Sequence, residues 1–268
     1  MYGAIVGDIV GSVYERHNTS EYDFPLYKLW GHRHSRFTDD SVLTIATASA
    51  LLKNNGIKNL NVDLFASEYK EFHKRFPNRG YGRGFSAWTG EPEGVYGDSY
   101  GNGSAMRVSP IGWVSNNVTE VLNLATMSAC CSHGHEEGIK GSQAIAGAIC
   151  VARTTHSKDA VESFVLNNFD YDLNATVQEL IPHSSFAACQ STVPPAIRAF
   201  LDSDSYEDAI RRAIVMGGDS DTIAAMTGSI AEAYYDGVPV RLRSIAYLLL
   251  PISMRKIVTQ FRITYGLP

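Results

Sequence analysis

The fold prediction starts from residues 2–15, whose sequence is YGAIVGDIVGSVYE. Apolar side chains recur there at helical spacing and share one broad face, namely Ile5, Val6, Ile9, Val10 and Val13. Glycine occupies every fourth position, at Gly3, Gly7 and Gly11. Because glycine lowers helix propensity, we expect these three to allow a neighbouring backbone to approach closely. The stretch therefore predicts a helix over 2–15 that packs tightly against another helix.

Helical periodicity continues along the rest of the chain. Further helices are predicted over 42–53, 62–76, 119–131, 138–154, 158–167, 192–202, 206–216, 222–235 and 240–258. Alternating strand patterns bounded by hairpin signals are scarce, and no repeat or linker marks a domain boundary. The sequence therefore predicts one all-α domain over residues 1–268, built largely from contacts between small residues.

Composition sets the class of protein. With 268 residues, 44% hydrophobic and 19% charged, the chain has the composition of a soluble globular protein with a substantial core. The net charge of −5 gives no electrostatic footprint for duplex nucleic acid, so sequence-specific nucleic-acid binding is not expected. No long apolar run predicts a membrane span or a secretion signal. The four cysteines are typical of reduced thiols in a cytoplasmic protein.

Two short acidic clusters suggest a metal site. One is FTDDS at 37–41 and the other is GGDSDT at 217–222, and each runs into a small-residue helix. Clustered carboxylates repel one another, so a fold that keeps them together usually has a cation to offset the repulsion. All the donors are hard oxygens, which favours Mg²⁺, Mn²⁺ or Ca²⁺ over zinc.

Helix capping is the alternative interpretation of these clusters. Asp, Ser and Thr are preferred N-cap residues, and acidic residues in a first turn complement the helix dipole. One such cluster alone would favour capping. Two clusters of the same composition favour a metal site, because a helix cap uses only one carboxylate and the second carboxylate of each cluster then has no capping role.

The segment 79–110 breaks the helical pattern and is predicted to be a long irregular loop rich in glycine and aromatic residues. Such a loop brings backbone N–H groups and aromatic faces close to an anionic nucleotide, although many glycine-rich loops only connect elements. His133 lies in a histidine-rich stretch with Cys130 and Cys131, but the spacing does not suit zinc. A phosphate or a ribose is the alternative partner for His133.

Five blocks, in this order, resemble the ADP-ribosylglycohydrolase family over nearly the whole chain. They are GDIVGSVYE at 7–15, FTDD at 37–40, GYGRG at 80–84, SYGNGSAMR at 99–107 and GGDSDT at 217–222. The combination is specific, although no single block is. The resemblance implies a single compact orthogonal helical bundle around two Mg²⁺ ions, for which Mn²⁺ is a possible substitute.

Matching the blocks residue by residue implies a site. The metal ligands would be Thr38, Asp39, Asp40, Asp219, Asp221 and Thr222. Glu15 matches the glutamate that reaches the metals in the branch that acts on serine-linked and polymeric ADP-ribose. Substrate contacts are implied for Gly82, Ser99, Tyr100, Gly101, Asn102 and His133. The adenine-stacking phenylalanine of that branch has no counterpart here, and Tyr96 is the candidate replacement.

The implied reaction is hydrolysis of the glycosidic bond at ribose C1″, through an oxocarbenium-like transition state. Glu15 is the candidate general acid or base, because the other carboxylates are assigned to metal. Asp8 is interpreted as structural, and Asp98 either caps the loop or faces the site. The expected partners are ADP-ribose and an ADP-ribosylated protein or other macromolecule. Three alternatives remain: an ADP-ribosyl-arginine hydrolase, a dinucleotide phosphohydrolase and a non-catalytic, crystallin-like protein.

Overall fold

Helices form the regular structure in the computed structural model, which describes residues 1–15, 19–53, 59–180 and 186–268. They are α1 (Tyr2–Gly11), α2 (Asp39–Lys53), α3 (Val62–Arg75), α4 (Arg83–Thr89), α5 (Gly103–Met106), the 3₁₀ helix η2 (Ser109–Trp113), α6 (Val118–Cys130), α7 (Glu136–Thr155), α8 (Lys158–Asn168), α9 (Val177–Leu180), α10 (Cys189–Leu201), α11 (Tyr206–Val215), α12 (Ser220–Tyr234), α13 (Val240–Leu249) and α14 (Ile252–Tyr265). Two isolated bridges are the only β pairing in this part of the chain. The all-α prediction is confirmed. None of the helices found in these ranges combines the length and apolar character needed to cross a bilayer.

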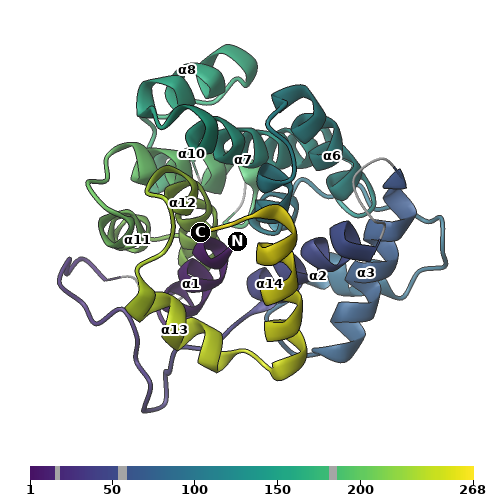
Figure 1. Ribbon diagram of the computed structural model, residues 1–268, viewed down its shortest axis with the longest axis horizontal. Helices are drawn as coiled ribbons and strands as arrows, with labels where there is room; N and C mark the ends of the chain where they lie inside the picture. The colour runs from purple at the N-terminus through teal and green to yellow at the C-terminus, as the bar shows by residue number, and fades with distance from the viewer. Residues whose placement is uncertain (16–18, 54–58, 181–185) are drawn as a thin grey trace.

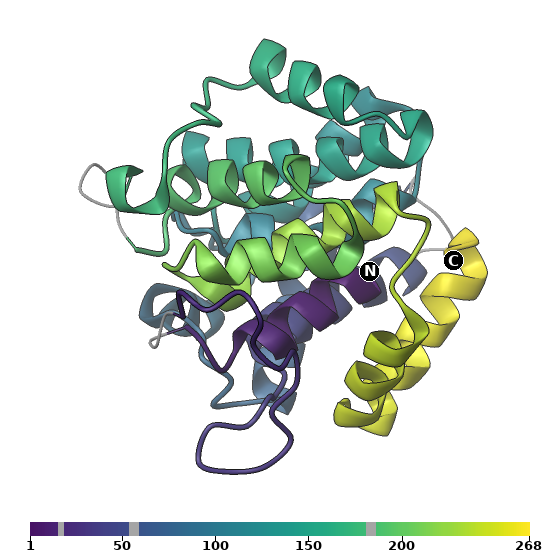
Figure 2. The ribbon, with the colours of Figure 1, turned by 90° about the vertical axis from the view of Figure 1, so that its left-hand side faces the viewer.

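Helices α1 and α12 pack side by side at the centre of the molecule (Figures 1 and 2). At their contact, the backbone of α1 lies directly against the backbone of α12. A Cβ built on Gly7 would lie 2.1 Å from the carbonyl oxygen of Ala224, and one on Gly3 would lie 2.0 Å from that of Gly228. The predicted role of the α1 glycines is therefore confirmed, and their partner is α12.

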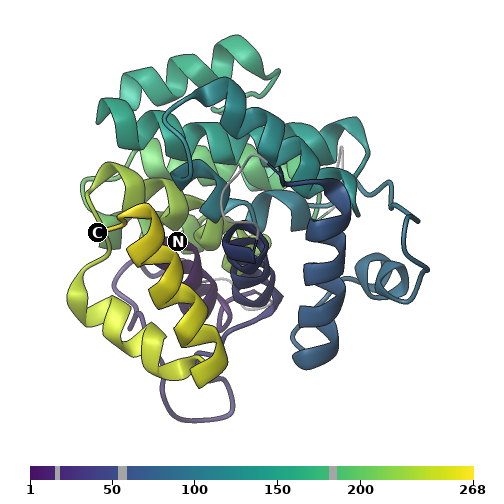
Figure 3. The ribbon, with the colours of Figure 1, turned by 45° about the vertical axis from the view of Figure 1, so that its right-hand side comes forward.

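The remaining helices surround this central pair. Helices α7, α10 and α11 pack on α12, and α2 packs between α1, α3 and α14. Figure 3 shows α3 running beside α2, with α4 on the outer side of α3 and the α13–α14 pair along the opposite side of the molecule. Ile5, Ile9 and Ile223 are fully buried between these layers. Because α1 and α12 approach so closely, polar residues near their facing ends are brought together as well.

Two helix boundaries near the acidic clusters differ from the prediction. Helix α1 ends at Gly11 rather than at residue 15. Turns follow it, in which the backbone N–H of Ser12 donates to the Asp8 carbonyl and that of Tyr14 donates to the Gly11 carbonyl. Glu15 therefore lies in a turn beyond the helix end. Helix α2 begins at Asp39 instead of residue 42, so its two aspartates stand in the first turn.

Two longer segments also differ from the prediction. The predicted helix 240–258 is two helices, because Pro251 cannot continue the hydrogen-bond ladder and forces Leu250 into an extended conformation. Helix α14 then continues to Tyr265. The segment 79–110 is not wholly irregular, since it contains the short helices α4 and α5. The short helix α9 was also not predicted.

Candidate active site and metal centre

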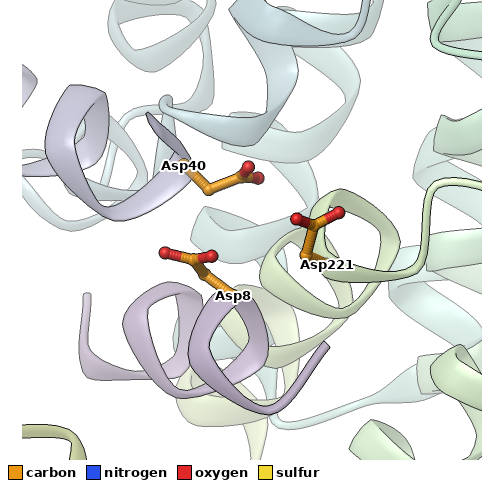
Figure 4. Close-up of side chains that lie close together, drawn as sticks. All are labelled: Asp8, Asp40 and Asp221. Carbon is orange, nitrogen blue, oxygen red and sulfur yellow. The ribbon is translucent and has the colours of Figure 1, made fainter. Parts of the chain in front are cut away.

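Three aspartates from three helices meet in the interior. Asp8 comes from α1, Asp40 from the first turn of α2 and Asp221 from the first turn of α12. All are buried, and one carboxylate oxygen of each lies within 4.8 Å of the others. Figure 4 shows the three carboxylates pointing toward one another. Before α12, Gly217 and Gly218 both have positive φ, a backbone conformation that glycine adopts without strain.

Asp8 holds the start of α2 in place. Its carboxylate accepts hydrogen bonds from the backbone N–H of Thr38 at 2.9 Å and of Ser41 at 3.0 Å. The hydroxyl of Thr38 donates to it at 2.6 Å, and that of Ser41 donates as well. Asp8 thus caps a helix other than its own, which agrees with the structural interpretation of this residue. Its position within the carboxylate cluster was not predicted and corrects that interpretation in part.

Asp40 is less completely paired than Asp8. One of its oxygens accepts from the Thr222 hydroxyl at 3.3 Å and lies 3.2 Å from the Thr38 hydroxyl, whose single proton goes to the nearer Asp8. Its other oxygen, Oδ1, is buried and has no hydrogen-bond partner in the described part of the chain. A buried acceptor without a partner is costly, and a cation would satisfy it.

The two outer aspartates are oriented by backbone and amide groups. The side-chain N–H of Asn102 donates to Asp219 at 2.8 Å, and the backbone N–H of Asp39 donates to the Arg79 carbonyl at 2.9 Å. Gly80 follows with φ +104, and a Cβ there would lie 3.0 Å from Asp39 Oδ1. The loop that contains Gly80 therefore lies directly against the acidic turn of α2.

Burial and mutual repulsion disfavour the charged form of these carboxyl groups. Burial raises the pKa of Asp39 and Asp40 well above the usual range, and the Asp8 charge raises both further. Burial, followed by the charge of Asp219, does the same to the pKa of Asp221. The pKa of Asp219 rises only to about 6, because hydrogen bonds from Asn102 and Asp221 oppose the effect of burial. The cluster is built to be neutralised by positive charge or by protons.

A cleft of about 330 Å³ opens onto this cluster. Glu15 lines it, and its charge acts on Asp39, Asp219 and Asp221. The walls also include two arginines and two aromatic residues that the sequence analysis did not select, namely Arg36, Arg79, Phe85 and Phe186. Because these residues are spread over three separate segments, no local pattern could have indicated them.

The sequence matches the ADP-ribosylglycohydrolase family over residues 1–254. The chain belongs to this family. Membership makes it an enzyme of the glycohydrolase class, one that acts on ADP-ribosyl groups. The human protein named ADP-ribosylhydrolase ARH3 is 28% identical, with 88% of this chain and 85% of the human protein covered. The mouse protein of the same name is also 28% identical, over 87% of this chain and 82% of its own length.

A solved structure shares the fold. Its title is "ADP-ribosylglycohydrolase-related protein complex", and it superposes with a TM-score of 0.72 at 23% identity. The match covers 97% of this chain and 94% of the other. The family's all-α architecture is therefore present here across the described residues.

The ADP-ribosylglycohydrolase blocks come together as the resemblance implied, with one exception. The six residues implied as metal ligands all line the cleft, as do Gly82, Ser99, Gly101, Asn102 and His133. The exception is Tyr100, whose ring packs edge-on against His135 at 5.6 Å and does not line the cleft.

The proposed adenine-stacking residue and Asp98 also lie away from the cleft. The hydroxyl of Tyr96 donates to Asp63 at 2.7 Å, so its ring is turned toward α3. The aromatic residues that line the cleft are Phe85 and Phe186. Asp98 forms an isolated bridge with His133 and does not line the cleft either.

Backbone N–H groups of the 97–102 loop are largely engaged within the protein. Those of Gly97 and Ser99 donate to the carbonyls of Cys131 and Ser132, and that of Asn102 donates to Ala187. The N–H of Gly101 donates to the Ser99 hydroxyl at 3.0 Å. This loop therefore leaves fewer free backbone donors for an anion than its glycine content suggested.

Proposed function

We propose that this protein is a Mg²⁺-dependent hydrolase that cleaves the glycosidic bond at ribose C1″ and releases ADP-ribose. The substrate would be a modified macromolecule, or an O-linked ADP-ribose ester or polymer, and residues 1–268 would act as one catalytic domain. The observation that carries the proposal is the buried cluster of Asp8, Asp40 and Asp221 at the base of a cleft that Glu15 also lines.

The residues present fit a divalent metal. Asp40 Oδ1 is buried without a partner among the residues that the structure describes, and the surrounding oxygen ligands are carboxylates and threonine hydroxyls, which Mg²⁺ prefers. Thr38, Asp39 and Asp40 would provide ligands from the start of α2, and Asp219, Asp221 and Thr222 from the start of α12. Asp8 accepts hydrogen bonds from two backbone N–H groups and two hydroxyls, so it would hold the α2 ligands in place. We propose two Mg²⁺ ions, with Mn²⁺ as a substitute.

The chain's own residues would orient the substrate and move the proton. When bound, the metal would supply Lewis-acid assistance at the ribose. Glu15 would act as general acid or base, because it lines the cleft from a turn and is not among the proposed ligands. Asn102 would fix the orientation of Asp219, to which its amide donates at 2.8 Å. His133 and Ser99 would contact the ADP-ribose.

An oxygen linkage is the proposed substrate bond. The Tyr14-Glu15 pair and the loop from Ser99 to Gly103 resemble the serine- and polymer-acting branch of the family. The full-length relatives that match are named ADP-ribosylhydrolase ARH3. An O-linked ribose leaves as an alkoxide that requires a proton, and Glu15 is placed to provide one. A guanidinium leaving group from arginine has less need of an acid.

The decisive experiment is release of ADP-ribose from a panel of defined linkages, with and without EDTA. The panel would include ADP-ribose on serine, on arginine, on an acetyl group, on a nucleic-acid base and in a polymer. We expect intact ADP-ribose from an oxygen-linked substrate, and loss of activity with EDTA that excess Mg²⁺ restores. Activity on arginine-linked ADP-ribose alone would contradict the proposed oxygen linkage and indicate an ADP-ribosyl-arginine hydrolase. Release of AMP would indicate a phosphohydrolase, and no product from any linkage would favour the non-catalytic alternative.

A further inference from the structure

Arg107 is a buried cation without a carboxylate partner among the described residues. The side chain is fully buried, directly after α5. Its Nη2 donates to the Ser128 carbonyl at 2.8 Å and to the Ser132 hydroxyl at 2.9 Å, and its guanidinium lies 3.9 Å from the Tyr69 ring centroid. Nε and Nη1 have no partner in the described ranges. Burying a guanidinium in this way costs stability, which indicates a purpose beyond packing.

Ser132 connects this arginine to His133. The Ser132 oxygen accepts from Arg107, and it lies 2.8 Å from Nδ1 of His133. A hydroxyl carries a single proton to donate. Among the described residues, Nδ1 of His133 is the nitrogen or oxygen atom in position to accept the proton of the Ser132 hydroxyl. With Ser132 as the donor to Nδ1, the proton of a neutral His133 ring lies on Nε2.

The Nε2 atom of His133 faces the loop that borders the cleft. A Cβ built on Gly103 would lie 2.8 Å from Nε2, and one on Gly101 would lie 3.7 Å away. His133 is itself one of the cleft residues, and the described part of the chain provides no acceptor for Nε2. Burial, and then the charge of Arg107, hold the pKa of His133 well below its usual range, so the ring is neutral.

We propose that Arg107 and Ser132 are positioning residues that hold His133 as the neutral Nε2–H tautomer, which donates a hydrogen bond to a ligand oxygen in the cleft. Only the identity of that ligand, ADP-ribose, rests on the proposed function. The ligand oxygen would belong to the diphosphate or to a ribose. The tautomer itself is a property of the free protein.

The test is the tautomeric state of His133 in ligand-free protein labelled with ¹⁵N-histidine. Long-range ¹H–¹⁵N correlation spectra report which ring nitrogen carries the proton, and His133→Gln assigns the signals. We expect Nε2 protonated in the native protein. Ser132→Ala should shift both nitrogen signals toward a mixture of tautomers and weaken ADP-ribose binding roughly 2- to 10-fold, the effect of one lost hydrogen bond. Ser132→Thr keeps the hydroxyl and should restore both.

Ser128→Ala is the matched control. It removes a buried hydroxyl that bonds the Tyr69 hydroxyl at 2.7 Å but keeps the backbone carbonyl that accepts from Arg107, so it should leave the His133 signals unchanged. Arg107→Met should shift the tautomer as Ser132→Ala does. If Arg107→Met does not fold, the pair of serine variants still decides the outcome.

Three results would overturn the proposal. They are Nδ1 protonated in the native protein, a Ser132→Ala spectrum identical to the native one, and a shifted tautomer with unchanged ADP-ribose affinity. If the native protein does not bind ADP-ribose at all, the proposed function fails, while the ligand-free spectra still test the positioning of His133.

Discussion

At the scale of single residues, the candidate site depends on which carboxylate oxygens are already paired. The hydrogen bonds that the Asp8 carboxylate accepts within the described residues come from the turn that starts α2, whereas the buried Asp40 Oδ1 has no partner among them. Sequence patterns indicated both aspartates but could not rank them, since pairing depends on atoms brought together from different helices. The same holds for Asn102, which was expected at the substrate: it lines the cleft and also donates to Asp219.

The proposed metal ligands can be tested one at a time. Asp221→Ala and Asp219→Ala should remain folded but lose the rise in melting temperature that Mg²⁺ gives the native protein, because a ligand that binds only the folded state stabilises it. At a Mg²⁺ concentration of 100 times Kd, one bound ion raises the free energy of unfolding by about 2.7 kcal/mol. Thermal unfolding with and without Mg²⁺ measures it. Asp63→Ala, an exposed aspartate on α3, should keep the full shift. A full shift in both site variants would disprove the assignment.

Glu15 should affect turnover rather than binding. Glu15→Gln keeps the size of the side chain but cannot exchange a proton, and general acid–base groups contribute about 10²- to 10⁴-fold to rates. We expect ADP-ribose affinity within a few-fold of native and a loss of turnover of that size. Calorimetry and single-turnover kinetics would separate the two effects. Glu21→Gln changes an exposed glutamate further along the same loop and should be fully active. Native turnover in Glu15→Gln would transfer the role to another carboxylate.

At the scale of helices, the contact between α1 and α12 links fold to site. The glycine spacing in residues 2–15 predicted a close helix partner, and helical periodicity located most helices to within a few residues. The exceptions have local causes. Pro251 divides a predicted helix, and α4 and α5 are too short for a periodic pattern to show. Which helix lies against α1 is a tertiary property that the spacing alone does not specify.

Gly7→Ala tests this contact. The added Cβ would lie 2.1 Å from the Ala224 carbonyl oxygen, so α1 and α12 must separate. Overpacking of this kind typically costs about 1–3 kcal/mol, and separation also moves Asp8 relative to Asp221, so Mg²⁺ stabilisation should weaken as well. Denaturant unfolding with and without Mg²⁺ measures both effects. Gly84→Ala is the control, because a Cβ there meets nothing within 4 Å in α4 and should stabilise the helix by about 0.5–1 kcal/mol. Equal stability of Gly7→Ala and native protein would show that the contact is not tight.

At the scale of the whole molecule, the sequence predicted the helical class and indicated the two acidic segments that line one cleft although they lie far apart along the chain. The cleft was only partly predictable. Its acidic base comes from recognisable blocks, whereas Arg36, Phe85 and Phe186 reach it through the paths of three separate loops and helices. Buried polar groups outside the cleft were equally hidden, because burial depends on how all the helices pack. Tyr69 is fully buried and Tyr206 is almost fully buried, and the hydroxyl of each is hydrogen-bonded to groups on other helices.

These buried groups predict how stability depends on alkaline pH. Burial raises the pKa of Tyr206 and Tyr171 well above the usual range, and that of Cys189 to about 12. In the unfolded chain the same groups ionise near pH 9–10, so above that range the unfolded state binds fewer protons than the folded state. The stabilisation is therefore fully present below about pH 9 and is lost as pH rises toward the folded pKa values. Denaturant unfolding at a series of pH values should show this decline.

Tyr206→Phe isolates one contribution to that decline. The variant loses the hydrogen bond from the Tyr206 hydroxyl to the Gly3 carbonyl, which spans 3.1 Å between α11 and α1. It should therefore be less stable than native protein by about 1 kcal/mol at pH 8. Above pH 10 its stability should fall less steeply, by up to about 1.4 kcal/mol per pH unit, because one fewer proton is released on unfolding. The two stability curves should then converge as pH rises. Curves that stay parallel from pH 8 to pH 11 would mean that Tyr206 ionises equally in the folded and unfolded states.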